Sequence, residues 1–166
     1  MSLVIMAIGL PGSGKTTLFK PLAEKYGLSH ISRDAVFNEM FGVDSDHRAF
    51  IGEVFQETAR RLDAAIREGK SVVRESIFAD PEERREIIAA ARESGATRVV
   101  GVFIDIDLEV AKERNQKRER VVQDEVLEWR HLQFQHYPPG LEDGFDAFYT
   151  IDQIEEFEKN ELEGLV

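Results

Sequence analysis

The feature that most constrains this chain is the stretch Leu3–Thr17, in which an apolar run ends abruptly at Gly9. From there the sequence follows the spacing G-x-x-x-x-G-K-T, with Lys15 and Thr16 in the last two positions. Glycine permits backbone turns that are closed to other residues, so successive N–H groups can converge on an anion. The apolar run predicts a strand and the residues after the glycines predict a helix, which is the context of a phosphate-binding P-loop. The stretch therefore predicts a strand, a P-loop and a helix whose N-terminus points at a phosphate.

Nucleotide phosphates are the ligand that such a loop predicts. The Lys15 side chain can reach the β- and γ-phosphates, and the Thr16 hydroxyl is a suitable ligand for Mg²⁺. We therefore expect ATP and Mg²⁺ as cofactors. The loop residues expected to bind the nucleotide are Gly9, Leu10, Pro11, Gly12, Ser13, Gly14, Lys15, Thr16 and Thr17.

Composition excludes several classes of protein. The chain has 166 residues, no cysteine and a formal net charge of −11. Disulfides and thiolate metal sites are therefore excluded, and a surface for extended nucleic acid, which needs a basic footprint, is not expected. No apolar run is long enough to span a membrane, and the first one leads directly into the P-loop rather than into a signal-peptide cleavage site. We expect a cytoplasmic protein without a membrane partner, monomeric or a small homo-oligomer, whose residues 1–166 form one domain.

Strand-like and helix-like patterns alternate along the whole chain. The apolar runs predict strands at 3–8, 28–32, 71–75, 98–104 and 145–151. Helical periodicity and capping residues predict helices at 15–27, 35–41, 46–69, 80–91, 107–120 and 124–135. Such alternation is typical of a parallel sheet covered by helices, in which Trp129 would be a core or loop anchor.

Ligands bind such sheets at the carboxyl ends of the strands, so the polar residues at these ends are candidates for chemistry. Asp34 follows the second strand, where a carboxylate can take the proton of an attacking hydroxyl; alternatively, it caps a helix beginning at Ala35. Glu75 ends the third strand, where it can hold Mg²⁺ or bind an acceptor substrate. Asp105 competes for the metal role, although a helix that starts two residues later makes capping the simpler explanation for it.

A positively charged segment at approximately 112–122 stands out in this acidic chain. Arg114 and Arg118 are four residues apart, and like charges at that spacing on a helix repel by a few tenths of a kcal/mol. A phosphate between them would reverse the sign, so we expect a mobile lid whose arginines close on the nucleotide. The alternative is a solvated helix face on which Glu113 and Lys117 form an ordinary ion pair.

Together, these motifs resemble the polynucleotide-kinase-type P-loop kinases, a broad group that includes zeta-toxin-like enzymes and small-molecule kinases. The likeness rests on the sequences GLPGSGKTT, SRD, PEERR and AKERNQKR. It implies a three-layer α/β P-loop NTPase fold, with a five-stranded parallel sheet in the order 2-3-1-4-5, helices on both faces and a helical lid. It also implies that Lys15 and Thr16 hold the phosphates and Mg²⁺, that Asp34 is the catalytic base, and that Arg114 and Arg118 are lid arginines.

Two departures from the group's pattern concern the acceptor. The polynucleotide kinases commonly have R-D-D after the second strand and D-T-N after the third, where this chain has Ala35 and Ile77. We therefore expect an ATP-dependent kinase that phosphorylates a hydroxyl of a small molecule or nucleotide-like acceptor. A polynucleotide 5′-hydroxyl kinase is the first alternative. A nucleotide-binding ATPase or switch without an acceptor is the second.

Overall fold

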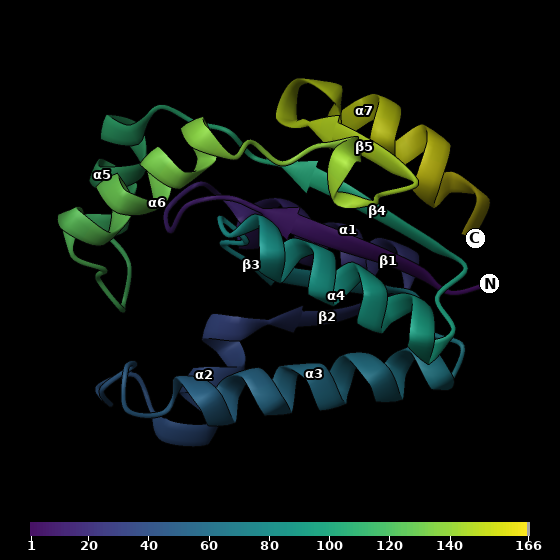
Figure 1. Cartoon of the computed structure of the whole chain (residues 1–166), viewed down its shortest axis with the longest axis horizontal. Coiled ribbons are helices and arrows are strands. Elements are labelled where there is room, and N and C mark those ends of the chain that lie inside the picture. Colours follow the sequence, from purple (N-terminus) through teal and green to yellow (C-terminus); the bar gives the residue numbers. More distant parts are fainter. Residues whose placement is uncertain (166) are drawn as a thin grey trace.

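The computed structural model describes residues 1–165 and is built on a five-stranded parallel sheet (Figure 1). The strands run in the order β2-β3-β1-β4-β5, which confirms the expected order. Their bounds are β1 Leu3–Ile8, β2 Ser29–Ser32, β3 Val72–Ser76, β4 Arg98–Phe103 and β5 Ala147–Thr150.

Helices connect the strands and cover the sheet. Their bounds are α1 Lys15–Tyr26, α2 Arg33–Phe41, α3 Ile51–Arg67, α4 Pro81–Ser94, α5 Leu108–Gln116, α6 Asp124–His136 and α7 Ile154–Phe157. Short 3₁₀ turns lie at Leu141–Asp143, Ile151–Gln153 and Glu163–Leu165, and a π turn lies at Glu158–Leu162. Among residues 1–165, no helix combines the length and the apolar character needed to cross a membrane.

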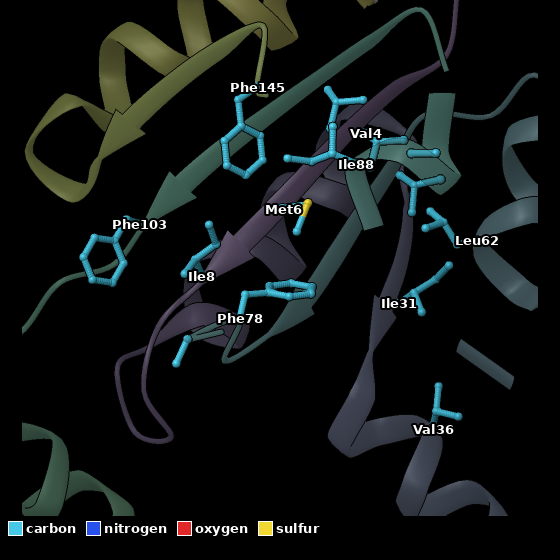
Figure 2. Packing of buried hydrophobic residues seen from close by; sticks show 14 of the residues in the cluster. Val4, Met6, Ile8, Ile31, Val36, Leu62, Phe78, Ile88, Phe103 and Phe145 are labelled. Carbon is cyan, nitrogen blue, oxygen red and sulfur yellow. The ribbon is translucent and has the colours of Figure 1, made fainter. Parts of the chain in front are cut away.

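The central strand β1 divides the hydrophobic core into two layers. All six of its residues are buried, and successive side chains of a strand point to opposite faces of the sheet. Met6 and its neighbours on one face pack with residues of α3 and α4 (Figure 2), whereas Ile5 and its neighbours on the other face pack with α1 and the C-terminal turns. The sheet therefore lies between two helical layers, as the three-layer expectation requires.

Capping residues fix where several helices begin. The Asp80 carboxylate accepts the Glu82 N–H at the start of α4, as the sequence predicted. The hydroxyl of Ser32, not the carboxylate of Asp34, caps α2 by accepting the Ala35 N–H, so the capping alternative for Asp34 is wrong. Asp34 instead lies in the first turn of α2, where it lines a cavity described below.

Capping by Asp105 is also wrong. Asp107 caps α5 by accepting the N–H groups of Glu109 and Val110. Asp105 is exposed and does not line either of the two main cavities described below. The nearer aspartate therefore satisfies the free N–H groups of the helix, and Asp105 lies outside the cavity lined by Thr16 and Glu75.

Three further expectations need correction. Helix α3 begins at Ile51 rather than Asp46, because the Asp46 carboxylate accepts the Arg48 N–H and folds that stretch into a turn. Helix α5 ends at Gln116, because the chain turns there and the backbone N–H groups of the next two residues bond to carbonyls three residues back. Trp129 is not a core anchor: it is 52% exposed because its helix buries a different face.

A buried ion pair joins helix α4 to the segment after α6. Arg84 is 1% exposed, and its Nε lies 2.8 Å from Asp143 Oδ2. The same guanidinium donates to the carbonyl oxygens of Phe78, Ala79 and Tyr137. These contacts satisfy the guanidinium almost completely. Arg84, the first arginine of the PEERR sequence, therefore connects α4 to the segments around it and does not enter a site.

Candidate active site

The P-loop lies at the carboxyl end of β1, on the side of the sheet where α2, α5 and α6 gather (Figure 1). Gly12 and Gly14 have φ angles of 81° and 97°, in the left-handed region that favours glycine. A Cβ on Gly12 would also lie 2.6 Å from the Ala111 carbonyl oxygen, so the loop can pack against α5 only with glycine there. The glycines of the motif therefore set both the turn and the close approach of the lid helix.

Lys15 is held over its own loop by backbone acceptors. Its Nζ donates to the carbonyl oxygens of Gly9 at 2.7 Å and Leu10 at 2.9 Å. Burial lowers the pKa of Lys15 to about 8, against the opposing effect of the Glu75 and Asp34 carboxylates. The ammonium group is thus positioned at the mouth of the phosphate loop and remains mostly protonated at neutral pH.

A row of three side chains connects the P-loop to the neighbouring strands. The Thr16 hydroxyl donates to Glu75 Oε1, and Glu75 Oε2 lies 2.7 Å from His30 Nε2. Glu75 is buried at the end of β3, with both carboxylate oxygens held in place. Hydroxyl and carboxylate oxygens are ligands that Mg²⁺ prefers, and this ion usually takes only one or two carboxylates together with substrate phosphates. The donor set therefore fits Mg²⁺ shared with a nucleotide.

Asp34 and the lid form a second connection. Arg118 Nη2 donates to Asp34 Oδ2 at 2.7 Å. Burial favours the protonated form of Asp34, but the charges of Arg118, Arg33 and Lys15 outweigh it and hold the pKa of this carboxyl below its ordinary value. Asp34 is consequently a carboxylate at neutral pH.

The two lid arginines do not share a helix face. Arg114 lies within α5, with its Nη1 3.7 Å from where a Cβ on Gly14 would be, whereas Arg118 lies beyond the end of the helix. Both line the cavity in front of the P-loop. Glu113 and Lys117 are exposed and approach within 3.8 Å of each other, as the alternative of a solvated helix face expected. This pair does not exclude the lid arginines, because Arg114 and Arg118 line the cavity in the same structure. The structure therefore brings both arginines to the phosphate loop by a turn rather than by helical spacing.

Two cavities meet at these residues. One, of about 810 Å³, lies over the P-loop and extends to Ile151. The other, of about 820 Å³, lies between the start of α2, the loop before α3 and helix α6. Both are lined by Pro11, Lys15, Asp34 and Glu75. The predicted phosphate ligands, base and metal ligand thus stand at the junction between two compartments.

Several residues of the second cavity were not found from the sequence. They are Arg33, His47, Trp129 and Arg130. Arg33 had a usable signal, because it stands beside Asp34 at a strand end. The others come from a loop and from helix α6, and only the tertiary fold brings them to the same cavity.

Arg120 joins the lid to the wall of the second cavity. Its Nη2 donates to the carbonyl oxygen of Val43 at 2.8 Å and to that of Gly42 at 3.2 Å. Its guanidinium also lies 4.0 Å from the centre of the Phe37 ring. A movement of the lid would therefore shift or break these contacts with the loop that encloses the second cavity.

Comparison with known proteins agrees with this arrangement. A family model described as an AAA domain matches residues 4–137. A cytidylate kinase of Methanopyrus kandleri is 32% identical over 133 residues, covering 73% of this chain and 65% of the relative. A shikimate kinase of Paramagnetospirillum magneticum is 33% identical over 120 residues, covering 69% of this chain and 57% of the relative. The chain thus spans less than two thirds of the length of either relative.

The fold is shared with a component of the Pnkp1/Rnl/Hen1 RNA repair complex. The TM-score is 0.72 at 16% sequence identity, and the match covers 81% of this chain and 44% of the other. The family match includes the P-loop, both lid arginines and all the residues that line the second cavity. The chain belongs to the AAA domain family, and within it to the P-loop kinases.

Proposed function

We propose that this protein transfers the γ-phosphoryl group of Mg·ATP to a hydroxyl group of a small molecule. The observation that carries the proposal is the junction of two cavities at Lys15, Asp34 and Glu75. A kinase needs one compartment for the phosphate donor and one for the acceptor, meeting where the phosphoryl group moves.

The first compartment suits the nucleotide. The P-loop N–H groups and Lys15 hold the β- and γ-phosphates, and Arg114 closes over them from α5. Thr16 and Glu75 would hold the Mg²⁺ ion, and His30 orients the Glu75 carboxylate. When bound, the ion neutralises charge on the β- and γ-phosphate oxygens. The side chains thereby fix the donor in position before the acceptor arrives.

The second compartment presents the acceptor to Asp34. The Asp34 carboxylate accepts the proton of the acceptor hydroxyl as its oxygen bonds to the γ-phosphorus. The bond from the γ-phosphorus to the bridging oxygen breaks, and ADP leaves. A carboxylate with a lowered pKa is a weak base, but a loose transition state needs proton removal only late, so positioning matters more than basicity.

A hydroxyl acceptor suits this site better than a phosphate acceptor. A nucleoside monophosphate, the acceptor of a cytidylate kinase, would place its reacting phosphate oxygen beside the Asp34 carboxylate. Two like charges in contact are unfavourable, and a phosphate needs no base to become nucleophilic. The ionised Asp34 therefore favours an alcohol group.

Two alternatives remain distinguishable. A polynucleotide 5′-hydroxyl kinase would use the same base, but the net charge of −11 offers no basic track for a strand beyond its end. A nucleotide-binding ATPase or switch would have no use for a second cavity of about 820 Å³ beside the reacting phosphate.

An acceptor screen tests the proposal. ADP formation is measured with Mg·ATP and with shikimate, gluconate, cytidine, cytidine 5′-monophosphate or a 5′-hydroxyl oligonucleotide. We expect stimulation by a small alcohol that is abolished in Lys15→Ala and retained in Lys25→Ala, an exposed lysine of the same helix. Stimulation by the monophosphate alone or by the oligonucleotide alone would reject the small-alcohol acceptor. Steady ATP hydrolysis that no compound in an extended set of alcohols stimulates would favour the ATPase.

A further inference from the structure

Three arginines gather beside the second cavity without a carboxylate partner. Arg33 and Arg130 line the cavity, and Arg74 lies in the neighbouring strand β3. Among residues 1–165, none of the three makes an ion pair within 4.0 Å, although most other arginines of the chain do. Unpaired guanidinium groups in a protein with a net charge of −11 require an explanation.

Two of the three arginines are also incompletely hydrogen-bonded. Arg74 is 1% exposed; its Nη1 donates to the Glu75 carbonyl oxygen at 2.8 Å, but its Nη2 has no partner among the described residues. Arg130 donates from Nη1 to Gln133 at 2.8 Å, while its buried Nε has no partner there. Unsatisfied buried donors on charged groups are costly and uncommon in folded proteins. An anion in the cavity would supply the missing acceptor for Arg130 and offset the charge of Arg74.

The charges of these arginines act on one another. Burial, and then the charge of Arg33, lowers the pKa of Arg74 to about 10 and lowers the pKa of Arg130. The carboxyl group that acts on all three is Glu83, whose own pKa is raised by burial and whose Oε1 has no described partner. Glu75 also acts on Arg74, and Asp80 acts on Arg130. The three guanidinium groups are therefore close enough to repel one another, and burial disfavours the ionised form of the carboxyl group that acts on all three of them. A bound anion would relieve that repulsion.

Arg33 and Arg130 lie outside the lining of the nucleotide compartment. Arg33 and Arg130 line only the second cavity, whereas Arg114 and Arg118 line the cavity over the P-loop. The phosphates of ATP, held by the P-loop, therefore do not account for the unpaired arginines. An acidic ligand in the second cavity does.

We propose that the acceptor carries an anionic group, a carboxylate or a phosphate, which binds between Arg33 and Arg130. This inference rests on the proposed function, because it describes the substrate of the same site. Arg33 directly precedes Asp34, so the anionic group lies near the hydroxyl that is phosphorylated. The arginine fork matches the two oxygens of a carboxylate or phosphate, which fixes the orientation of the acceptor as well as its affinity.

The chain contains its own reporter for this site. Trp129 is its single tryptophan, lines the same cavity, and lies beside Arg130, whose guanidinium is 4.3 Å from the ring centre. An anion that draws Arg130 away from the ring would change the tryptophan fluorescence. The signal arises without turnover, so binding can be followed separately from catalysis.

The experiment titrates the full chain while Mg²⁺ and a non-hydrolysable ATP analogue saturate the P-loop. The probes are inorganic phosphate, acetate, gluconate against its neutral counterpart sorbitol, and cytidine 5′-monophosphate against cytidine. We expect at least one anionic probe to change the fluorescence. In at least one of the two pairs, gluconate with sorbitol or cytidine 5′-monophosphate with cytidine, the anionic compound should bind at least about ten-fold more tightly than the neutral one. Which pair shows the difference separates a carboxylate from a phosphate group.

Variants assign the binding to the cavity. Arg33→Gln should weaken binding of the anionic probe about ten-fold, as should Arg130→Gln. Arg85→Gln, which removes an exposed arginine outside both cavities, should leave binding unchanged. A thermal melt of each variant verifies folding, and Arg33→Lys, which keeps the charge but not the fork, should bind with intermediate affinity if Arg33→Gln does not fold.

Three results would overturn the inference. They are equal affinity for each acid and its neutral partner, no response to any anion, or unchanged anion binding in both arginine variants. The proposed function fails differently. If anions bind through Arg33 but no alcohol stimulates ADP formation, the acceptor reaction is wrong and the anion site stands. If a neutral alcohol is phosphorylated equally well by Arg33→Gln, the kinase stands and the anion site is wrong.

Discussion

Arg118 and Asp34 form an ion pair, with Nη2 and Oδ2 2.7 Å apart, between residues 84 positions distant in the sequence. The pair joins the segment after α5 to the first turn of α2, at the junction of the two cavities. In the proposed reaction Asp34 must face the acceptor hydroxyl while Arg118 faces the phosphate. We infer that nucleotide phosphates compete with Asp34 for Arg118, so that ATP binding also frees the base.

The place of Arg118 in the cavity over the P-loop predicts how its variants behave. Arg118→Ala should lower kcat far more than it alters the affinity for ATP, because the guanidinium acts on charge that develops during transfer. Arg118→Lys should recover part of the rate, since lysine keeps the charge but loses the planar fork. Steady-state and single-turnover kinetics with the acceptor identified by the screen measure both effects. A kcat in Arg118→Ala equal to that of the native chain would return the segment to a solvated surface role.

The lowered pKa of Lys15 predicts a pH dependence of ATP binding. The pKa is about 8 without nucleotide, and the protonated amine is the form that binds phosphate. Affinity should therefore be constant below that pKa and fall about ten-fold per pH unit above it, until the higher pKa of the complex is reached. Calorimetry with a non-hydrolysable analogue from about pH 7 to about pH 9.5 measures this decline. Lys15→Ala should bind weakly with no such slope, and the same slope in that variant would assign the effect to another group.

The buried Arg84–Asp143 pair predicts a large effect on stability with no direct effect on chemistry. Arg84→Met would leave the buried Asp143 carboxylate with only the Gly140 N–H and the Arg85 guanidinium, 4.0 Å away, as partners. Loss of the close partner of a buried charge costs about 3–5 kcal/mol in the free energy of unfolding. Arg85→Met, at the adjacent and 57% exposed position, should change it by less than about 0.5 kcal/mol. Urea unfolding followed by circular dichroism compares the two. Similar stability in both variants would mean that the buried pair contributes nothing.

Much of the fold could be predicted because its signals are local. The buried strand β1, the glycines of the P-loop and the cap at Asp80 each depend on residues within a few positions of one another. Strand order is not local, and here it came from a resemblance to known kinases rather than from the residues. The start of α3 was misplaced because a turn closed by Asp46 and a helix cap have the same residue types in sequence.

The site was only partly predictable for the same reason. The side chains grouped from the sequence lie at or after the carboxyl ends of strands: Lys15, Thr16, Asp34 and Glu75. Parallel strands bring these ends together, so sequence order was enough to group them. Arg130 belongs to a helix with no motif, and its approach to Arg33 depends on how the segment after α5 folds back. The resemblance named both lid arginines, but a shared helix face was the wrong geometry because α5 ends between them.

The role of Asp34 is the central claim, and Asp34→Asn tests it. Asparagine cannot accept a proton at neutral pH but has nearly the same shape. Ser32 caps α2, so the substitution removes no cap and should have little effect on thermal stability. Binding of Mg·ATP should be retained, while transfer to the acceptor should fall by about two to four orders of magnitude, nearer the low end if the transition state is loose.

The most direct measurement is the single-turnover rate of phosphoryl transfer in Asp34→Asn, with Mg·ATP and the acceptor both saturating. The account predicts a rate at least about a hundred-fold below that of the native chain, at an unchanged ATP affinity and melting temperature. A rate close to that of the native chain would show that Asp34 is not the base, and Glu75 would then be the residue to test.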